Sequence, residues 1–301
     1  MTAGRSGTVK TVDIDGPINY VDFGGDGPEM ILVHGLGGSV QNWFAVAPGL
    51  AENYRVTAVD LVGFGRTPRP EGRSAKVRDN RLVLDRFVDE VAGGSSILVG
   101  NSMGGAISIL EAAQEPDKVA ALVLVDPAVP YPAGQEADPV VAMTFGTYMM
   151  DNAEELVTAY LTQVGPEAAV RTTMELCCVD ADRVPAEVLD AQIELMKERS
   201  EMEWANGSMV EAARSLLELN ANEDDFFAAV KAITAPTLLV HGDSDRLIPL
   251  TAAQQLANIR PDWRFEVFAD TGHVPQLETP ERFLSVVGGW LETVLTKETV
   301  G

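Results

Sequence analysis

The chain has 301 residues, 46% of them apolar and 22% charged, a composition typical of a globular protein large enough to bury a sizeable core. Its formal net charge is −23, with 45 acidic residues against 22 basic ones. Nucleic acids and anionic membrane surfaces bind clustered lysine and arginine, so this charge argues against both as partners. The longest apolar run, Val119–Val125, is far shorter than the roughly 18 residues that suggest a membrane span.

The first ten residues lack the apolar stretch and the small-residue cleavage site of a secretory signal, so no export signal is expected. The two cysteines, Cys177 and Cys178, are adjacent and cannot form a disulfide framework. Together these features predict a reducing, cytoplasmic location. Because the chain has only these cysteines and three scattered histidines, we expect no structural zinc site.

Short apolar segments alternate with longer amphipathic segments over the first 127 residues. This alternation predicts an α/β fold, in which helices cover both faces of a mostly parallel sheet. The strands are expected at Val9–Ile14, Ile18–Phe23, Met30–Val33, Tyr54–Asp60, Ser96–Gly100 and Val119–Val125. The helices are expected at Gln41–Ala51, Val77–Ala92 and Gly104–Glu115.

Residues 128–222 show no convincing strand and predict helices alone. These helices are expected at Val140–Met150, Ala153–Val164, Pro166–Cys177, Pro185–Ser200 and Met202–Leu219. Strands and helices alternate again at Thr237–Val240, Ala252–Ile259, Arg264–Phe268 and Pro280–Leu295. We therefore predict an α/β core made of residues 1–127 and 223–301, interrupted by a helical insertion over residues 128–222. The methionines and aromatic residues of the insertion fit either a packed core or an adaptable lining for an apolar ligand.

Residues 100–105 read Gly-Asn-Ser-Met-Gly-Gly, directly after an apolar strand and at the start of a predicted helix. In this setting a sharp turn lifts the hydroxyl of Ser102 above the strand end, and the glycines allow strand and helix to approach closely. The amide hydrogens at the helix start face any developing negative charge. Ser102 is therefore the candidate nucleophile.

Residues 34–39 read His-Gly-Leu-Gly-Gly-Ser and also follow a buried strand. Such a glycine-rich loop can turn its amides inward, so the N–H groups of Leu36 and Met103 are expected to form an oxyanion hole. A plain glycine-rich turn and a phosphate-binding loop are the alternatives. Nucleotide cofactors are disfavoured, because neither G-x-G-x-x-G nor a following Gly-Lys-Ser/Thr is present.

The three histidines differ in position. His34 belongs to the glycine-rich loop, and His241 ends an apolar strand, where a structural hydrogen-bonding role is the common one. His273 ends the segment Asp-Thr-Gly-His, between the last strand and the last helix. Loops at the carboxyl edge of a parallel sheet collect catalytic groups, so His273 is the candidate general base.

The acid that orients the base is expected in residues 241–249, just past another strand end. Asp245 is preferred to Asp243, because Asp243 falls in a tight turn where aspartate commonly bonds the local backbone. Asp126, after an earlier strand, is a weaker candidate. Ser102, Asp245 and His273 then follow one another along the chain as nucleophile, acid and base.

These motifs resemble those of the α/β-hydrolase superfamily over residues from about Tyr20 to Val294. Residues 60–67, Asp-Leu-Val-Gly-Phe-Gly-Arg-Thr, resemble the loop that follows the strand before the nucleophile strand in that family. The insertion takes the position of the family's cap domain. The resemblance implies an eight-stranded sheet, a site between core and cap, and cofactor-free hydrolysis through an acyl-enzyme.

Among hydrolases of this type, the chain is expected to cleave carboxylic esters of small to medium, apolar, small-molecule substrates. Relatives with aspartate as nucleophile, such as haloalkane dehalogenases and epoxide hydrolases, fit poorly because Ser102 takes that place. Meta-cleavage-product hydrolases, which break carbon–carbon bonds, often share the Gly-Asn-Ser-Met-Gly-Gly string and are the alternative. The match is partial, because Val274 and Gly38 replace the tryptophan and proline usual in that family. A ligand receptor on the same scaffold is the alternative of another class.

Overall fold

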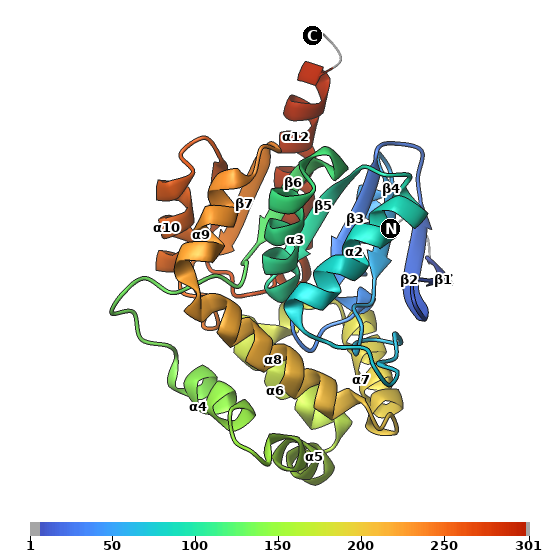
Figure 1. The fold of residues 1–301 in the computed structure, drawn as a ribbon, viewed down its shortest axis with the longest axis vertical. Helices are drawn as coiled ribbons and strands as arrows, with labels where there is room; N and C mark the ends of the chain where they lie inside the picture. The colour runs from blue at the N-terminus through green and yellow to red at the C-terminus, as the bar shows by residue number, and fades with distance from the viewer. Residues whose placement is uncertain (1–6, 299–301) are drawn as a thin grey trace.

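The computed structural model describes residues 7–298, and they form an eight-stranded sheet in the order β1-β2-β4-β3-β5-β6-β7-β8 (Figure 1). Strand β2 runs antiparallel to β1 and β4, while the other neighbouring strands are parallel. The strands are β1 (Thr8–Asp13), β2 (Pro17–Gly24), β3 (Glu29–Val33), β4 (Arg55–Val59), β5 (Ser96–Asn101), β6 (Val119–Val125), β7 (Thr237–Gly242) and β8 (Arg264–Phe268). The expected α/β-hydrolase fold, with its mostly parallel sheet, is confirmed.

The longer helices include three that match their expected bounds, at 77–92, 153–164 and 166–177. The helices are η1 (Val40–Trp43), α1 (Ala47–Leu50), α2 (Val77–Ala92), α3 (Met103–Gln114), η2 (Pro116–Lys118), α4 (Pro139–Tyr148), α5 (Ala153–Val164), α6 (Pro166–Cys177), η3 (Ala181–Arg183), α7 (Ala186–Ser200), α8 (Ala205–Ala221), α9 (Glu223–Ala232), α10 (Leu250–Ile259), α11 (Pro275–Glu278) and α12 (Pro280–Glu298). None of the described helices is long and apolar enough to cross a membrane.

The sheet is covered on both faces, and its strands divide their side chains between two apolar layers. In β3, Ile31 and Val33 join the layer that contains residues of α2, α3, α9 and α10. Met30 and Leu32 join the opposite layer, with residues of α1 and α12. Successive side chains of a strand point to opposite faces, so burial on both sides explains why these strands are apolar throughout.

The single helix expected over Gln41–Ala51 is wrong, because the structure has a short 3-10 turn, η1, followed by a separate α1. The Oγ of Ser39 accepts the N–H of Gln41, and the Oδ1 of Asn42 accepts the N–H of Ser39, so the turn is capped reciprocally. Pro48 has no N–H, and its ring would clash with the carbonyl four residues earlier in a continuous helix. Here it lies in the first turn of α1, where proline is tolerated.

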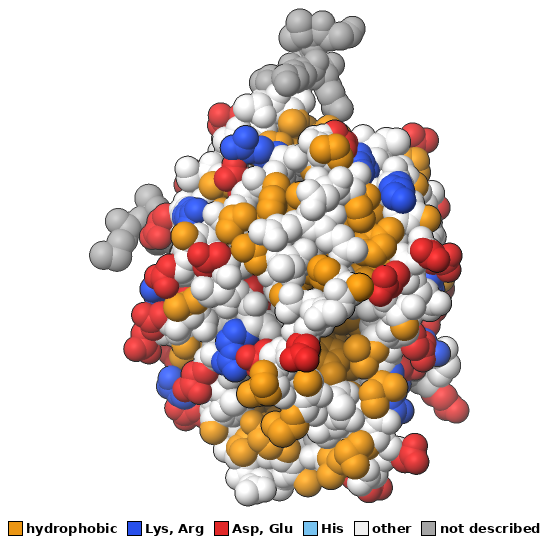
Figure 2. All heavy atoms as spheres, turned by 90° about the vertical axis from the view of Figure 1, so that its left-hand side faces the viewer, with side chains coloured by type: hydrophobic (Ala, Val, Ile, Leu, Met, Phe, Trp, Pro, Cys, Tyr) orange, Lys and Arg blue, Asp and Glu red, His pale blue; other side chains and the backbone are white. Residues whose placement is uncertain are grey.

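The helices of residues 128–222, which we call the cap segment, lie together at one end of the sheet (Figure 1). The chain leaves the sheet after β6 and returns to it at β7. Before the return, α9 packs against α3. The exact division of the chain into core and cap stays a prediction. Figure 2 shows apolar side chains gathered over the lower part of the molecule. The exposed apolar side chains of α4 and the turn that follows it are Val140, Met143, Met149 and Met150.

The nucleophile turn depends on a close backbone approach between α3 and β3. A Cβ added to Gly104, in the first turn of α3, would lie 2.2 Å from the carbonyl oxygen of Val33 and 2.5 Å from that of His34. Both are backbone atoms at the end of β3, and they cannot move without moving the sheet. Only glycine at 104 lets the start of α3 lie beside the glycine-rich loop.

Gly104→Ala is therefore expected to lower the free energy of unfolding by about 3 kcal/mol, since it overpacks a rigid backbone contact. Urea denaturation followed by circular dichroism measures the change. Gly146→Ala is the matched control, because Gly146 lies in α4 with nothing near its added Cβ. It should raise stability by about 0.5–1 kcal/mol, since alanine is the better helix former. Equal effects of the two substitutions would contradict the close approach.

A second prediction concerns Glu111, which is fully buried in α3 with Oε2 3.3 Å from Nη1 of Arg81. Burial, and then repulsion from Asp85, raises the pKa of Glu111 from 4.5 to about 7. The folded state therefore binds this proton more tightly than the unfolded chain, so stability is lost as the pH rises from about 4.5 through 7. Glu111→Gln removes this loss, and its free energy of unfolding should gain about 3 kcal/mol on that of the wild type between pH 4.5 and pH 8.

Urea denaturation at a series of pH values measures this gain. Glu115→Gln is the control, because Glu115 lies nearby with its Oε1 4.0 Å from the same Arg81, but its side chain is 42% exposed. If the free energies of unfolding of the wild type and of Glu111→Gln change with pH in parallel, the raised pKa of Glu111 is contradicted.

Candidate active site

Ser102 stands between β5 and α3 with φ 54° and ψ −118°, a strained conformation for a residue other than glycine. The surrounding backbone holds it there. Its N–H donates to the carbonyl of Val125 at 3.0 Å, and its own carbonyl accepts the N–H groups of Ala106 and Ala128. Its residue surface is 9% exposed, so the hydroxyl lies in a nearly enclosed position. The turn expected from the sequence is present.

The glycine-rich loop lies directly against Ser102. A Cβ at Gly35 would fall 2.9 Å from the Cβ of Ser102 and 3.5 Å from its Oγ, so the loop approaches the serine as closely as glycine allows. Leu36 follows Gly35 in this loop, and Met103 follows Ser102 at the start of α3. This arrangement is compatible with an oxyanion hole made by the amides of Leu36 and Met103, which stays a prediction.

His34 supports this loop from within the core. Its Nε2 accepts the N–H of Leu61 at 3.1 Å, so Nδ1 carries the proton and donates to the carbonyl of Gly35 at 2.7 Å. Burial lowers the pKa of His34 to about 4. A neutral, fully buried ring with both nitrogens bonded holds the loop and is not available as a general base.

The structure brings together two of the three candidate catalytic side chains. Nδ1 of His273 and Oδ2 of Asp245 are 2.7 Å apart, and both residues are buried. Oδ1 of Asp245 accepts the N–H groups of Leu247 and Ile248 at 2.7 and 3.0 Å. Asp243 is exposed, and its Oδ1 accepts the hydroxyl of Ser244. Asp245 is thus the aspartate of this turn that meets the histidine.

The charge of Asp245 is held in place by its neighbours. Burial alone acts to raise its pKa, but the nearby His273 ring and its hydrogen bond, together with the N–H of Ile248, outweigh burial, and the pKa falls below its usual value. A buried carboxylate bonded to Nδ1 fixes the histidine tautomer that leaves Nε2 free to accept a proton.

Among residues 7–298, no hydrogen bond joins the hydroxyl of Ser102 to the ring of His273. The two loops are connected instead through Asn101, the residue before the nucleophile. Its Nδ2 donates to the carbonyl of His273 at 3.1 Å and to that of Val125 at 3.0 Å. The sequence predicts no role for Asn101, although its position inside the nucleophile motif is a signal.

The cap segment also reaches the base. The carbonyl of Cys177, at the end of α6, accepts the N–H of His273 at 2.6 Å, and a Cβ at Gly272 would lie 2.2 Å from the same oxygen. The thiols of Cys177 and Cys178 are buried and free. Burial raises the pKa of Cys177 to about 12, so its thiol is protonated and not a nucleophile at neutral pH.

The cap segment presents apolar side chains to the glycine-rich loop. Leu36 packs with Phe145 of α4, Val157 of α5 and Met209 of α8 around a small buried cluster. The Cε of Met209 would lie 3.4 Å from a Cβ at Gly37. These contacts favour an apolar surface beside the serine for part of a substrate.

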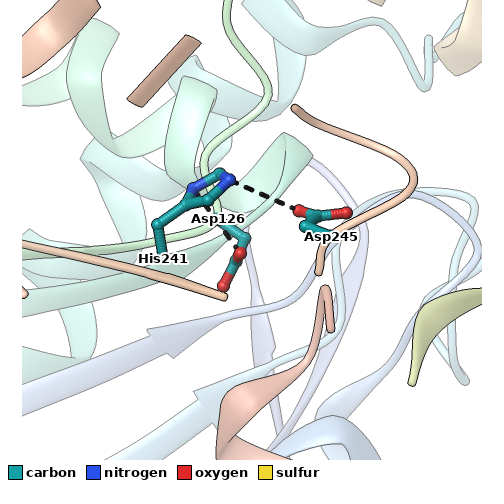
Figure 3. Close-up of side chains that lie close together, drawn as sticks. All are labelled: Asp126, His241 and Asp245. Atoms are coloured by element: carbon teal, nitrogen blue, oxygen red, sulfur yellow. Dashed lines mark ion pairs between the residues drawn. The ribbon is translucent and has the colours of Figure 1, made fainter. Parts of the chain in front are cut away.

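Two further polar residues of the sheet edge, His241 and Asp126, lie beside Asp245 (Figure 3). Nε2 of His241 is 3.0 Å from the carbonyl of Ile248, which agrees with the structural role expected for it. Asp126 accepts the N–H of Gly242 at 2.9 Å. Within the described residues, Asp126, His241 and Asp245 are the group whose spacing could suit a metal ion. A cation there would compete for Oδ2 of Asp245, which already bonds His273.

Known proteins share this fold. The family model described as the alpha/beta hydrolase fold matches residues 28–280. The chain is 30% identical over 278 residues to the 2-hydroxy-6-oxo-2,4-heptadienoate hydrolase of Pseudomonas putida, covering 91% of this chain and 92% of that protein. It is also 30% identical over 267 residues to the pimeloyl-[acyl-carrier protein] methyl ester esterase of Aromatoleum aromaticum, covering 84% and 94% of the two chains.

Solved structures agree with this. A putative lipase from Acinetobacter baumannii is similar with a TM-score of 0.77 and 26% identity, over 97% of this chain and 93% of that one. A meta-cleavage product hydrolase from Pseudomonas fluorescens is similar in fold, with a TM-score of 0.73 and 23% identity, over 94% and 97% of the two chains. With a family model that matches most of its length, this chain belongs to the α/β-hydrolase fold family.

Proposed function

We propose that this chain is a serine hydrolase in which Ser102 attacks a carbonyl carbon, His273 accepts the hydroxyl proton, and Asp245 stabilises the resulting imidazolium. The observation that carries the proposal is the 2.7 Å contact between Nδ1 of His273 and Oδ2 of Asp245, at the sheet edge where Ser102 is held in its strained turn. The proposal needs a bond from the serine hydroxyl to Nε2 of His273, and such bonds are often long or poorly aligned before substrate binds.

For the substrate, we rank carbon–carbon cleavage ahead of the ester hydrolysis that the sequence alone favoured. Several of the most similar relatives bear names of that kind, among them the heptadienoate hydrolase described above. Another is the 2-hydroxymuconate semialdehyde hydrolase of a Pseudomonas species, 30% identical over 287 residues that cover 89% of this chain and 88% of that protein. The shared Gly-Asn-Ser-Met-Gly-Gly string points the same way. We therefore propose a 2-hydroxy-6-oxo-dienoate type of substrate.

The chemistry suits the same three groups. Oγ of Ser102 would add to the ketone carbon, and the amides of Leu36 and Met103 would bind the oxyanion. In the 2-oxo tautomer of the substrate, the carbon beside this ketone is saturated and is joined through an alkene to the 2-oxo group. When the oxyanion collapses, the bond to that carbon breaks, and its electron pair passes through the alkene into the 2-oxo group to give a dienolate. The imidazolium of His273 then gives its proton to the dienolate. Water activated by His273 then releases the acid from Ser102.

Ester hydrolysis is the second candidate, and the cap segment favours it. The segment's cations are Arg171, Arg183, Lys197, Arg199 and Arg214, and each donates to a carboxylate or to backbone carbonyls. A dienoate carboxylate in an apolar pocket needs a cation or several donors, whereas a neutral ester does not. The esterase relative from Aromatoleum aromaticum agrees with this reading.

Kinetics on two substrate classes test the proposal. Wild-type enzyme is assayed with a vinylogous 2-hydroxy-6-oxo-dienoate and with short p-nitrophenyl esters, and the dienoate is expected to have the higher kcat/KM. Ser102→Ala should lower both activities by at least about 10³-fold, because it removes the nucleophile. Ser244→Ala, at an exposed serine beside Asp245, is the control and should retain them.

Each other outcome has a defined meaning. Activity retained in Ser102→Ala would remove the mechanism. Turnover of esters with none of the dienoate would assign the ester reaction. Product release that stops at about one molecule per chain would indicate a ligand receptor, since a true enzyme cycles many times.

A further inference from the structure

A second carboxyl, that of Asp126, lies close to the proposed catalytic acid. Oxygens of Asp126 and Asp245 and a ring nitrogen of His241 all lie within 4.8 Å of one another (Figure 3). Asp126 follows β6 with φ 44°, and its backbone N–H is tied to the carbonyl of Val240. The side chains of all three are 0% exposed, so water cannot screen their charges.

The hydrogen bonds of His241 fix its proton. The carbonyl of Ile248 can only accept, so the Nε2 that lies 3.0 Å from it carries the hydrogen. Burial lowers the pKa of His241, which keeps the ring neutral. Its Nδ1 then carries only a lone pair, which lies 3.5 Å from Oδ1 of Asp126 and has no hydrogen-bond partner in the described part of the chain.

Within residues 7–298, no cation lies beside Asp126 to balance its charge if it is ionised. Its Oδ1 accepts one backbone N–H, from Gly242, while its Oδ2 is buried and has no hydrogen-bond partner among these residues. The groups that face it are the carboxylate of Asp245, the lone pair of His241 and, further away, Glu278. Burial and then the charge of Asp245 raise the pKa of Asp126 well above its usual range. A proton on Oδ2 removes the repulsion between the two carboxylates and gives Oδ2 a hydrogen that it can donate.

We propose that Asp126 is a positioning residue that stays a neutral carboxylic acid at neutral pH and donates its proton to the carboxylate of Asp245. The pair then carries one negative charge, which faces His273. A hydrogen bond to a carboxylate is stronger than one to a neutral ring nitrogen, so Asp245 is the preferred acceptor over Nδ1 of His241. The donated hydrogen bond helps to hold Asp245 in place. The inference rests on the proposed hydrolase site for its catalytic meaning.

Infrared spectroscopy tests, without any substrate, whether the carboxyl of Asp126 is protonated. The wild type at pH 8 should show the carbonyl stretch of a protonated carboxyl that is lost in Asp126→Asn. Asp243→Asn, at an exposed aspartate two residues from Asp245, is the control and should leave that band in place. If the wild type shows no carbonyl stretch of a protonated carboxyl that Asp126→Asn lacks, the proposal is overturned. A stoichiometric metal ion in the purified wild type that Asp126→Asn fails to retain would also overturn it.

The rate at which a fluorophosphonate probe labels Ser102, measured against pH, tests the positioning role. Asp126→Ala should slow labelling about tenfold, since Asp245 loses a donor, and Asp126→Asn should recover most of the loss because its amide can donate. The midpoint of the pH profile should stay in place in Asp126→Asn, which is neutral like the protonated acid. If Asp126 were ionised, this variant would remove a negative charge near His273 and lower the midpoint by about one pH unit.

The two kinds of failure are distinguishable. A wild type that never labels would contradict the proposed hydrolase, while the infrared band would still report the proton on Asp126. A wild type that labels normally, with a lowered midpoint in Asp126→Asn or no recovery over Asp126→Ala, would contradict the role of Asp126. If Asp126→Ala fails to fold, the midpoint in Asp126→Asn and the infrared band decide the question.

Discussion

The structure depends on the approach of the first turn of α3 to the end of β3. Gly104 makes this possible, since any side chain there would strike the carbonyls of Val33 and His34. The approach sets the strained turn at Ser102 and brings the serine against Gly35. Because both contacts involve backbone, the apolar layers on the two faces of the sheet must hold them in place, and the strain at Ser102 is supported by the whole core.

At this edge of the sheet, some titratable side chains are kept neutral and others are charged and hydrogen-bonded. The chain carries a formal charge of −23, yet at the site both nitrogens of the neutral His34 ring bond backbone groups, and Nε2 of the neutral His241 ring faces the carbonyl of Ile248. The carboxylate of Asp245 accepts two backbone N–H groups and bonds the ring of His273. Because the edge is otherwise neutral, the negative charge of Asp245 acts on His273 without interference from other charges.

The sequence was most informative where the pattern was local. Apolar strands buried on both faces, glycine motifs at strand ends and the order of serine, aspartate and histidine were enough to predict the sheet and the pairing of Asp245 with His273. The split of Gln41–Ala51 was missed, although Pro48 and the cap at Ser39 signal it. The helix α9 was also missed, although its first turn holds Glu223, Asp224 and Asp225, a pattern that favours a helix start.

Contacts between distant parts of the chain could not be predicted. Asn101 bonds a carbonyl 172 positions away, and Asp126 meets a backbone amide 116 positions away. Neither distance leaves a trace in local composition. Sequence reasoning weighed Asp126 as an alternative to Asp245, whereas the fold places the two carboxyls side by side, so their relation is electrostatic coupling and not competition for one role.

The N–H of His273 bonds the carbonyl of Cys177, so the loop that carries the candidate proton acceptor is held in part by α6, which lies outside the sheet. Any movement of α6 away from this loop would break the bond. The position of His273 is therefore set by the cap segment as well as by the sheet.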